Sequence, residues 1–180
     1  MIQNYYKNKN IPHFNNIFYT NLEGVVIMEC NEMKELFAVM ILYRMNFENL
    51  HWNSIGEEFD NAHKEISTEY YEKLNSDIDV VAEMLARMRI NPMNYKEVWD
   101  FIESGEKDYM LVSSDSTYMR DDIVQMSQRM LGDICTAIEN AHECECMKDI
   151  KNMGIKSTLE AMYDYYDLQV RYINGRKCRI

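Results

Sequence analysis

The sequence is poor in the residues that interrupt helices. It contains only 6 Gly and 2 Pro among 180 residues, against 15 Met, so tight turns between short strands are not favoured. This scarcity excludes most all-β folds and predicts long helices, which makes the expected fold all-α. A chain of this length is expected to form one domain with a sizeable core.

Positive charge is also scarce. The chain has 19 Lys and Arg against 30 Asp and Glu, which gives a net charge of -11. This balance argues against a protein that grips nucleic acid over its whole surface, because phosphate binding depends on Lys and Arg. The acidic balance is compatible with a protein that collects cations.

Long apolar runs are missing as well. The longest, residues 36–42, is far shorter than the roughly 18 residues that a membrane span needs. The start of the chain shows no secretory segment, and the cysteines form an odd set at irregular spacing. We therefore expect a soluble, cytoplasmic protein with reduced thiols. The cysteines are Cys30, Cys135, Cys144, Cys146 and Cys178.

Apolar side chains recur at three- and four-residue steps in four segments, each predicted to be an amphipathic helix. The first helix is expected to begin at Asn31, a good capping residue, and to run to about Ser54. Its wholly apolar stretch, 36–42, indicates burial on more than one side, as a subunit interface would give. The second helix is predicted over about 57–89, because Pro92 cannot continue it.

A long crossover is predicted between the second and third helices. It carries a short amphipathic helix at 95–104, and its length allows the two long helices that it joins to run parallel. Ser116 or Thr117 is the expected cap of the third helix, and the fourth is expected to stop at Asn174-Gly175. The predicted organisation is an N-terminal arm, a four-helix bundle and a basic C-terminal tail, at residues 1–28, 29–174 and 175–180.

The candidate functional side chains lie between residues 51 and 83. His51 and His63 fall on the apolar stripes of the first two helices, whereas Asp79 and Glu83 are spaced i, i+4, so that both carboxylates point the same way. Imidazole together with carboxylate suits iron, manganese or zinc. A lone His on an apolar stripe is usually a hydrogen-bonded core residue, but two of them with paired acids indicate a transition-metal site.

The same stretch follows a family pattern, made up of His51, Trp52, Asn53, Gly56, Phe59, His63, Asp79 and Glu83. This pattern resembles the Dps family, the ferritin-like mini-ferritins that protect DNA in starved bacteria. The resemblance implies a ferritin-like four-helix bundle assembled as a hollow dodecamer. It also implies non-haem iron at an intersubunit site, with His51 and His63 of one subunit facing Asp79 and Glu83 of its partner. There Fe²⁺ would be oxidised by peroxide or dioxygen and then stored as ferric mineral, which protects the cell from oxidative damage.

The chain departs from the family pattern in two ways. Where the family usually has an acid four residues after the second His, this chain has Ser67. The two carboxylates also lie one residue farther from His63 than in the family, which indicates an insertion between His63 and Tyr70. A helix accommodates such an insertion as a π-bulge, a feature frequent at functional sites. Glu65 and Glu69 are candidates to replace the missing acid, and a shell with a degenerate metal site is the alternative.

Two further groups of ligand-type residues are present. The Glu-x-x-His motif of di-iron four-helix bundles occurs twice, at 48–51 and 139–142, which leaves open a site within one subunit. His142, Cys144 and Cys146 could bind zinc, but they lack the Cys-x-x-Cys spacing of structural zinc sites. We predict an exposed turn without a metal there.

The end of the chain is basic and contains no acid in its last ten residues. Many such tails displayed on a shell could hold DNA by multivalent charge contact, whereas a single tail would bind negligibly. A DNA-coating shell without redox chemistry is therefore a rival function. The basic residues are Arg171, Arg176, Lys177 and Arg179.

Overall fold

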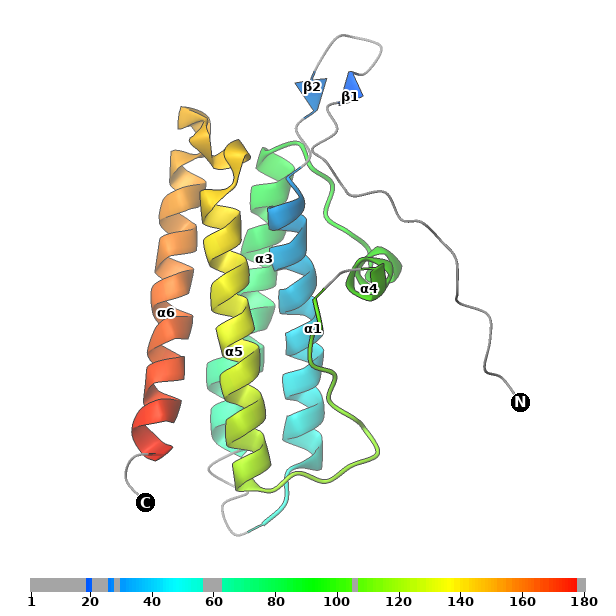
Figure 1. Ribbon diagram of the computed structural model, residues 1–180, viewed down its shortest axis with the longest axis vertical. Helices are drawn as coiled ribbons and strands as arrows, with labels where there is room; N and C mark the ends of the chain where they lie inside the picture. Colours follow the sequence, from blue (N-terminus) through cyan, green and yellow to red (C-terminus); the bar gives the residue numbers. More distant parts are fainter. Residues whose placement is uncertain (1–18, 21–25, 28–29, 57–62, 105–106, 178–180) are drawn as a thin grey trace, which may run out of the picture.

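The computed structural model describes residues 19–20, 26–27, 30–56, 63–104 and 107–177. Four long helices form a bundle, and a fifth, shorter helix lies beside it (Figure 1). The second long helix is composite, because residues 63–65 lead into a π-helical segment and then into α3. The helices are α1 (Asn31–Asn53), the π-helix η1 (Ile66–Tyr71), α3 (Glu72–Arg87), α4 (Tyr95–Ser104), α5 (Arg120–Glu143) and α6 (Met153–Lys177).

The helices have the order and directions of a ferritin-like bundle. In Figure 1, α1 and α6 run downward while α3 and α5 run upward, so the helices joined by the long crossover are parallel. Helix α4 sits within that crossover and packs against α1, on the side away from α6. The all-α bundle, the crossover and the bounds predicted for its short helix are confirmed.

Short elements complete the chain. Strands β1 (Tyr19–Thr20) and β2 (Val26–Ile27) form an antiparallel pair within the predicted N-terminal arm, whose other residues, 1–18, 21–25 and 28, lie outside the described part. Two 3₁₀ turns, η2 (Glu145–Lys148) and η3 (Ile150–Asn152), connect α5 to α6. Residues 178–180 of the predicted basic tail are also outside the described residues.

Helix α1 is the centre of the core. Its residues 36–43 are all buried, because α1 is in contact with α3, α4 and α5 together. The cover on the outer side comes from α4, whose Val98 is 3% exposed. The apolar stretch of α1 is thus buried within a single chain, and the inference that a subunit interface buries it is wrong.

A buried amide holds the crossover against α1. Asn46 donates from Nδ2 to the Met110 carbonyl over 2.7 Å and accepts from the Val112 backbone N–H over 3.2 Å. Farther along, the Tyr118 N–H donates to the Asn53 carbonyl at 2.9 Å, just after the last turn of α1. Since a buried amide is costly unless it is paired, these bonds fix the path of the crossover and, with it, the end of α1.

Two predicted helix ends need correction. Helix α5 begins after Met119, whose N–H donates to the Asp122 carboxylate over 3.2 Å, and neither Ser116 nor Thr117 caps it. The acid three residues inside the helix decides the start, because its carboxylate satisfies a free N–H at the positive helix end. Helix α6 continues through Gly175 to its last described residue, since glycine inside a helix costs only about 1 kcal/mol.

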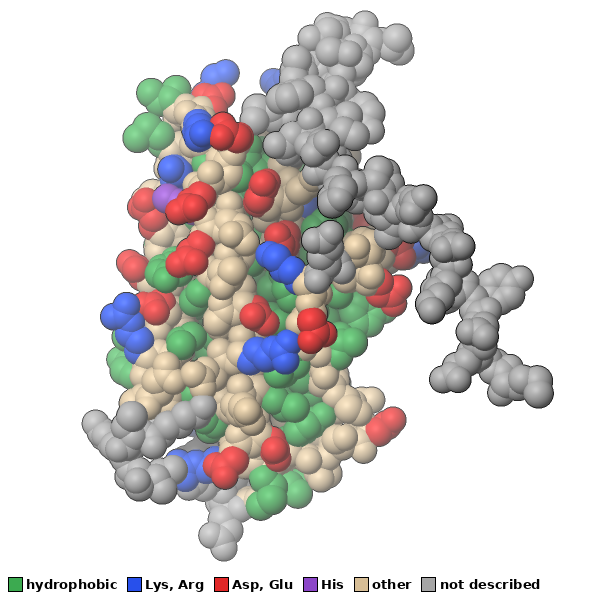
Figure 2. Space-filling view, viewed as in Figure 1, with side chains coloured by type: hydrophobic (Ala, Val, Ile, Leu, Met, Phe, Trp, Pro, Cys, Tyr) green, Lys and Arg blue, Asp and Glu red, His purple; other side chains and the backbone are tan. Residues whose placement is uncertain are grey.

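None of the described helices combines the length and the apolar character that a membrane span requires. On the face shown in Figure 2, acidic and basic side chains are interspersed over α5 and α6. Some of these charges are paired across one helical turn, as in the 2.5 Å ion pair of Arg171 with Asp167. The acidic balance of the chain is therefore spread over this surface rather than gathered in one patch.

Candidate metal centre

The two predicted histidine ligands lie together. His51, in the last turns of α1, and His63, at the start of the composite helix, have their Nε2 atoms 2.9 Å apart and their ring centroids 3.8 Å apart. Two nitrogens bonded at about 2.1 Å to one metal ion, and about 90° apart around it, lie about 3 Å from each other. The spacing of the two imidazoles thus fits two ligands of a single ion.

The surroundings of His51 favour the neutral imidazole that a metal requires. Burial lowers the pKa of His51, the neighbouring His63 lowers it further, and Glu48 acts in the opposite direction. The Tyr71 ring stacks on the His51 ring, with centroids 5.5 Å apart and an interplanar angle of 29°. Nδ1 of His51 is buried and has no hydrogen-bond partner among the described residues. A half-buried His whose surroundings favour the neutral form is ready to act as a ligand.

The predicted helix insertion is confirmed as a π-helix. Over 66–71 the chain makes a wider turn, in which the Glu72 N–H donates to the Ser67 carbonyl, five residues back. Ile66 and Tyr70 remain buried, at 1% and 2% exposure, although they lie four residues apart in a widened helix. The extra residue is absorbed here, so the helix on either side keeps its face toward the core.

The acids closest in sequence to His63 are engaged elsewhere. Glu65 accepts a hydrogen bond from the Tyr70 hydroxyl at 3.0 Å, and Glu69 accepts one from Tyr165 of α6, also at 3.0 Å. In the part of the chain that the structure describes, no carboxylate lies within 4.8 Å of ligand atoms of both imidazoles. Neither acid completes the histidine pair within one chain.

The predicted carboxylates lie farther along the composite helix, in α3. Asp79 and Glu83 are both exposed on α3, one turn apart, and the Glu83 side chain is 64% exposed, with a loose ion pair to Arg87 at 3.6 Å. They share no described ligand cluster with His51 or His63. Within the described part of a single chain, the imidazoles and the carboxylates of the predicted site are therefore separate.

The alternative site within one subunit is wrong. Its two Glu-x-x-His motifs lie near the C-terminal ends of α1 and α5, which are at opposite ends of the bundle in Figure 1. His142 bonds instead with Glu160 of α6, with Nε2 3.1 Å from the carboxylate oxygen. The motif therefore occurs twice because the chain is helical and rich in acidic residues, and not because the two copies bind one metal ion.

A cysteine cluster at the far end was missed. Cys144 and Cys146 were expected in an exposed turn, but each is only 6% exposed, and both lie against Cys30, which is 1% exposed. Cys30 is 114 residues from Cys144 along the chain. No spacing rule in the sequence predicts that these cysteines meet. They meet because the fold places the start of α1 beside the turn after α5.

Comparison with solved structures shows the fold. No family profile matches the chain, and no curated sequence does. Antigen TpF1 from Treponema pallidum matches with a TM-score of 0.70 at 12% identity, over 82% of this chain and 89% of that one. A Dps protein from Vibrio cholerae is described as a member of a broad superfamily of ferritin-like diiron-carboxylate proteins. It matches with a TM-score of 0.69 at 20% identity, over 89% of this chain and 98% of that one. Dps from Staphylococcus aureus matches with a TM-score of 0.67 at 17% identity, over 88% of this chain and 97% of that one. The chain thus has the ferritin-like fold of Dps proteins.

Proposed function

We propose that the protein is an iron-oxidising mini-ferritin that works as a hollow homo-oligomer in the cytoplasm. Fe²⁺ binds between His51 and His63 of one subunit and Asp79 and Glu83 of a partner, is oxidised by peroxide or dioxygen, and is retained as ferric mineral. The observation that carries the proposal is the meeting of two Nε2 atoms at 2.9 Å in a chain with the Dps fold.

The separation of the ligands within one chain supports a shared site. Among the described residues, no carboxylate lies within 4.8 Å of ligand atoms of both histidines, while Asp79 and Glu83 stand exposed on α3 and share no cluster with them. In a two-fold dimer, the same surface patch of each subunit lies against the other subunit. The histidines of each subunit can then meet the carboxylates of its partner, which gives two complete sites per dimer. The full set of imidazoles and carboxylates is the one expected for iron.

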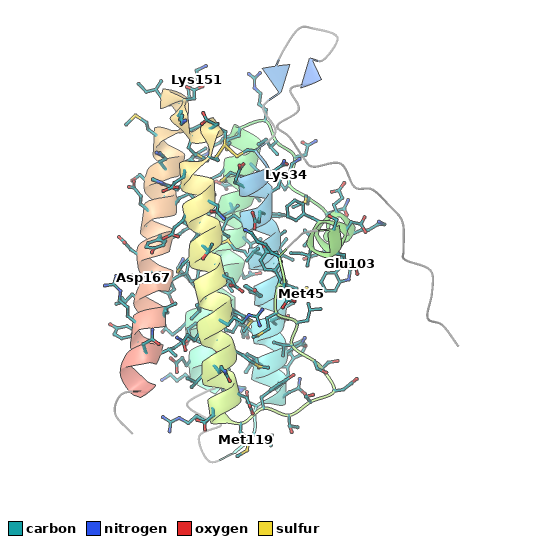
Figure 3. The ribbon with its side chains drawn as sticks, in the orientation of Figure 1. Lys34, Met45, Glu103, Met119, Lys151 and Asp167 are labelled. Atoms are coloured by element: carbon teal, nitrogen blue, oxygen red, sulfur yellow. A yellow bond between two sulfur atoms is a disulfide. The ribbon has the colours of Figure 1, made fainter. Side chains whose placement is uncertain are left out.

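Exposed aromatic side chains on α1 and α4 support association between subunits. Trp52, next to the His51 ligand, is 67% exposed, and Tyr95 and Trp99 of α4 are 73% and 45% exposed. With Met45 of α1, labelled in Figure 3, the α4 aromatics line a groove between the two helices. Aromatic residues and Met are enriched in protein interfaces, and we assign this groove and Trp52 to the subunit contact.

The chemistry follows from the ligand types. Neutral imidazoles bind Fe²⁺, and the two carboxylates offset the additional positive charge when iron becomes Fe³⁺. Peroxide takes one electron from each of two Fe²⁺ ions, its O–O bond breaks, and with two protons it leaves as two water molecules. Because Glu65 and Glu69 bond to tyrosines, we expect one firm iron position and a weaker second one. Oxidation is then slower than in a site with a third acid.

The test is an anaerobic Fe²⁺ titration followed by peroxide. It compares the native protein with a double variant, His51→Ala with Asp79→Ala, and with His142→Ala as the matched control. We expect the double variant to lose tight Fe²⁺ binding and rapid oxidation, and the control to keep both, because His142 bonds to Glu160 at the other end of the bundle. Native-rate oxidation by the double variant, or a monomer in light scattering at micromolar concentration, would contradict the proposal.

A further inference from the structure

Three buried sulfur atoms meet at the end of the bundle opposite the histidines. Cys30 directly precedes α1, Cys144 directly follows α5, and Cys146 lies in η2. The Sγ atoms of Cys30 and Cys144 are 3.2 Å apart, and Sγ of Cys146 lies within bonding distance of both. A cysteine forms one disulfide at a time, so two such contacts to Cys146 cannot both be disulfides. The arrangement is three sulfur atoms gathered around one point.

The backbone holds this arrangement in place. In the turn, the Met147 N–H donates to the Cys144 carbonyl at 3.0 Å, and Asn152 Nδ2 donates to the Cys146 carbonyl at 2.7 Å. Figure 3 labels Lys34 near the start of α1 and Lys151 in the turn, both in the upper part of the bundle. The sulfurs thus come from two segments that are fixed independently and meet at one end of the fold.

The position of Cys30 is fixed by the start of α1. It is the residue before the first turn of α1, where its carbonyl accepts from the Lys34 N–H at 3.2 Å. The thiolate, rather than the thiol, is the metal ligand.

We propose that Cys30, Cys144 and Cys146 together bind one thiophilic divalent cation, Zn²⁺. Three soft sulfur ligands select such a cation over Fe²⁺ or Mg²⁺, and sets with three or four cysteines are among those of structural zinc sites. A carboxylate oxygen of Glu32 lies 3.9 Å from the Cys30 Sγ, but only the three sulfurs all lie within 4.8 Å of one another. Each bound thiol releases its proton to solvent. The ion ties the start of α1 to the α5–α6 connection.

A metal accounts for the cluster better than a disulfide does. A disulfide uses two of the sulfurs and leaves the third buried beside them, whereas a cation uses all three. The Cα separations, 6.3 Å for Cys30 with Cys146 and 5.5 Å for Cys144 with Cys146, are within the range for a disulfide, so the experiment must separate the two.

The experiment is a Co²⁺ titration of the reduced, metal-free protein without oxygen. We expect a thiolate-to-cobalt charge-transfer band that saturates at one Co²⁺ per chain and disappears when Zn²⁺ is added. Cys30→Ser, Cys144→Ser and Cys146→Ser each weaken or abolish the band. Cys135→Ser keeps it, because Cys135 is the remaining described cysteine and lies outside the cluster. His51→Ala also keeps it, so this test is independent of the iron site.

A second measurement on the native protein covers variants that fail to fold. Zn²⁺ is expected to protect the three clustered cysteines from alkylation, located by mass spectrometry, and to raise the melting temperature of the native protein. Absence of a thiolate band in the fully reduced native protein would overturn the proposal in favour of a disulfide. A band that is unchanged in Cys30→Ser would overturn the three-sulfur site as well.

Discussion

Deleting Thr68 should be tolerated, because the π-helix contains one residue more than a regular helix needs. In a regular α-helix, removal of one residue rotates the two sides by about 100° and shifts them by about 1.5 Å. In η1 the deletion instead leaves Ile66 and the buried Tyr70 three residues apart, which is the ordinary spacing of one helix face. His63 and α3, on the two sides of the deletion, then keep their orientation relative to the core.

The matched control is deletion of Thr136 in the regular helix α5. Both threonines are exposed, and each donates its hydroxyl to the carbonyl four residues back, over 2.7 Å for Thr68 and 3.1 Å for Thr136. Loss of one exposed hydrogen bond costs about 1 kcal/mol or less. Deleting Thr136 also rotates away the buried residues on one side, at the least Ala137, Ile138 and Ala141. At about 0.8 kcal/mol for each alanine methyl group and 1.5–3 kcal/mol for Ile138, the lost burial lowers the free energy of unfolding by roughly a further 3–5 kcal/mol.

The assay is thermal unfolding followed by circular dichroism, at one protein concentration because the protein is expected to be an oligomer. At roughly 2–4 °C per kcal/mol for a chain of this size, the Thr68 deletion should melt within about 4 °C of the native protein. The Thr136 deletion should melt at least about 6 °C lower or fail to fold. Equal losses in the two deletions would refute the assignment of the extra residue to η1.

Two further predictions concern buried charge and thiol reactivity. Asp77→Ala removes the partner of the Tyr166 hydroxyl, 2.7 Å away and buried, so we expect a loss of about 3 kcal/mol in unfolding free energy. The exposed Asp100→Ala should change it by less than about 0.5 kcal/mol in the same melts, and similar losses in both would contradict the buried network. Burial, followed by the charges of Asp167 and Glu139, raises the pKa of the Cys135 thiol to about 12. Its alkylation rate should therefore climb about tenfold per pH unit well past pH 9, and a plateau near the ordinary thiol pKa of about 8.5 would contradict this.

Helix periodicity was enough to predict the architecture. The bounds of α4 and the start of α1 follow from apolar spacing and breakers, whereas the π-helix follows from the family resemblance, against which this chain has one extra residue after His63. The end of α6 did not follow, because glycine is only a weak stop signal. The start of α5 depended on which side chain reaches a free N–H, and Asp122 does so where Thr117 does not.

The candidate site was predictable only where its residues are near in sequence. His51 and His63 are 12 residues apart on neighbouring helices, and the motif brought them together correctly. The stacking of Tyr71 on His51 depends on the twist of the π-helix, which no periodicity gives. Whether Asp79 and Glu83 join the histidines is a property of an assembly, so neither one sequence nor one chain decides it.

The central claim, that each iron site is shared between two subunits, is tested most directly by complementation. Shells that contain only His51→Ala chains, or only Asp79→Ala chains, should oxidise Fe²⁺ slowly, because every site lacks a ligand. In mixed shells, a dimer with one chain of each kind has one site with both defects and one site with none.

Shells are therefore assembled from equal amounts of the two variants, and their initial rate of Fe²⁺ oxidation by peroxide is compared with that of native shells. With random pairing, half of the dimers are mixed, and the account predicts recovery of about a quarter of the native rate. A mixed shell no faster than the two separate variants would contradict the account, because a site contained within one chain cannot be restored by its neighbour.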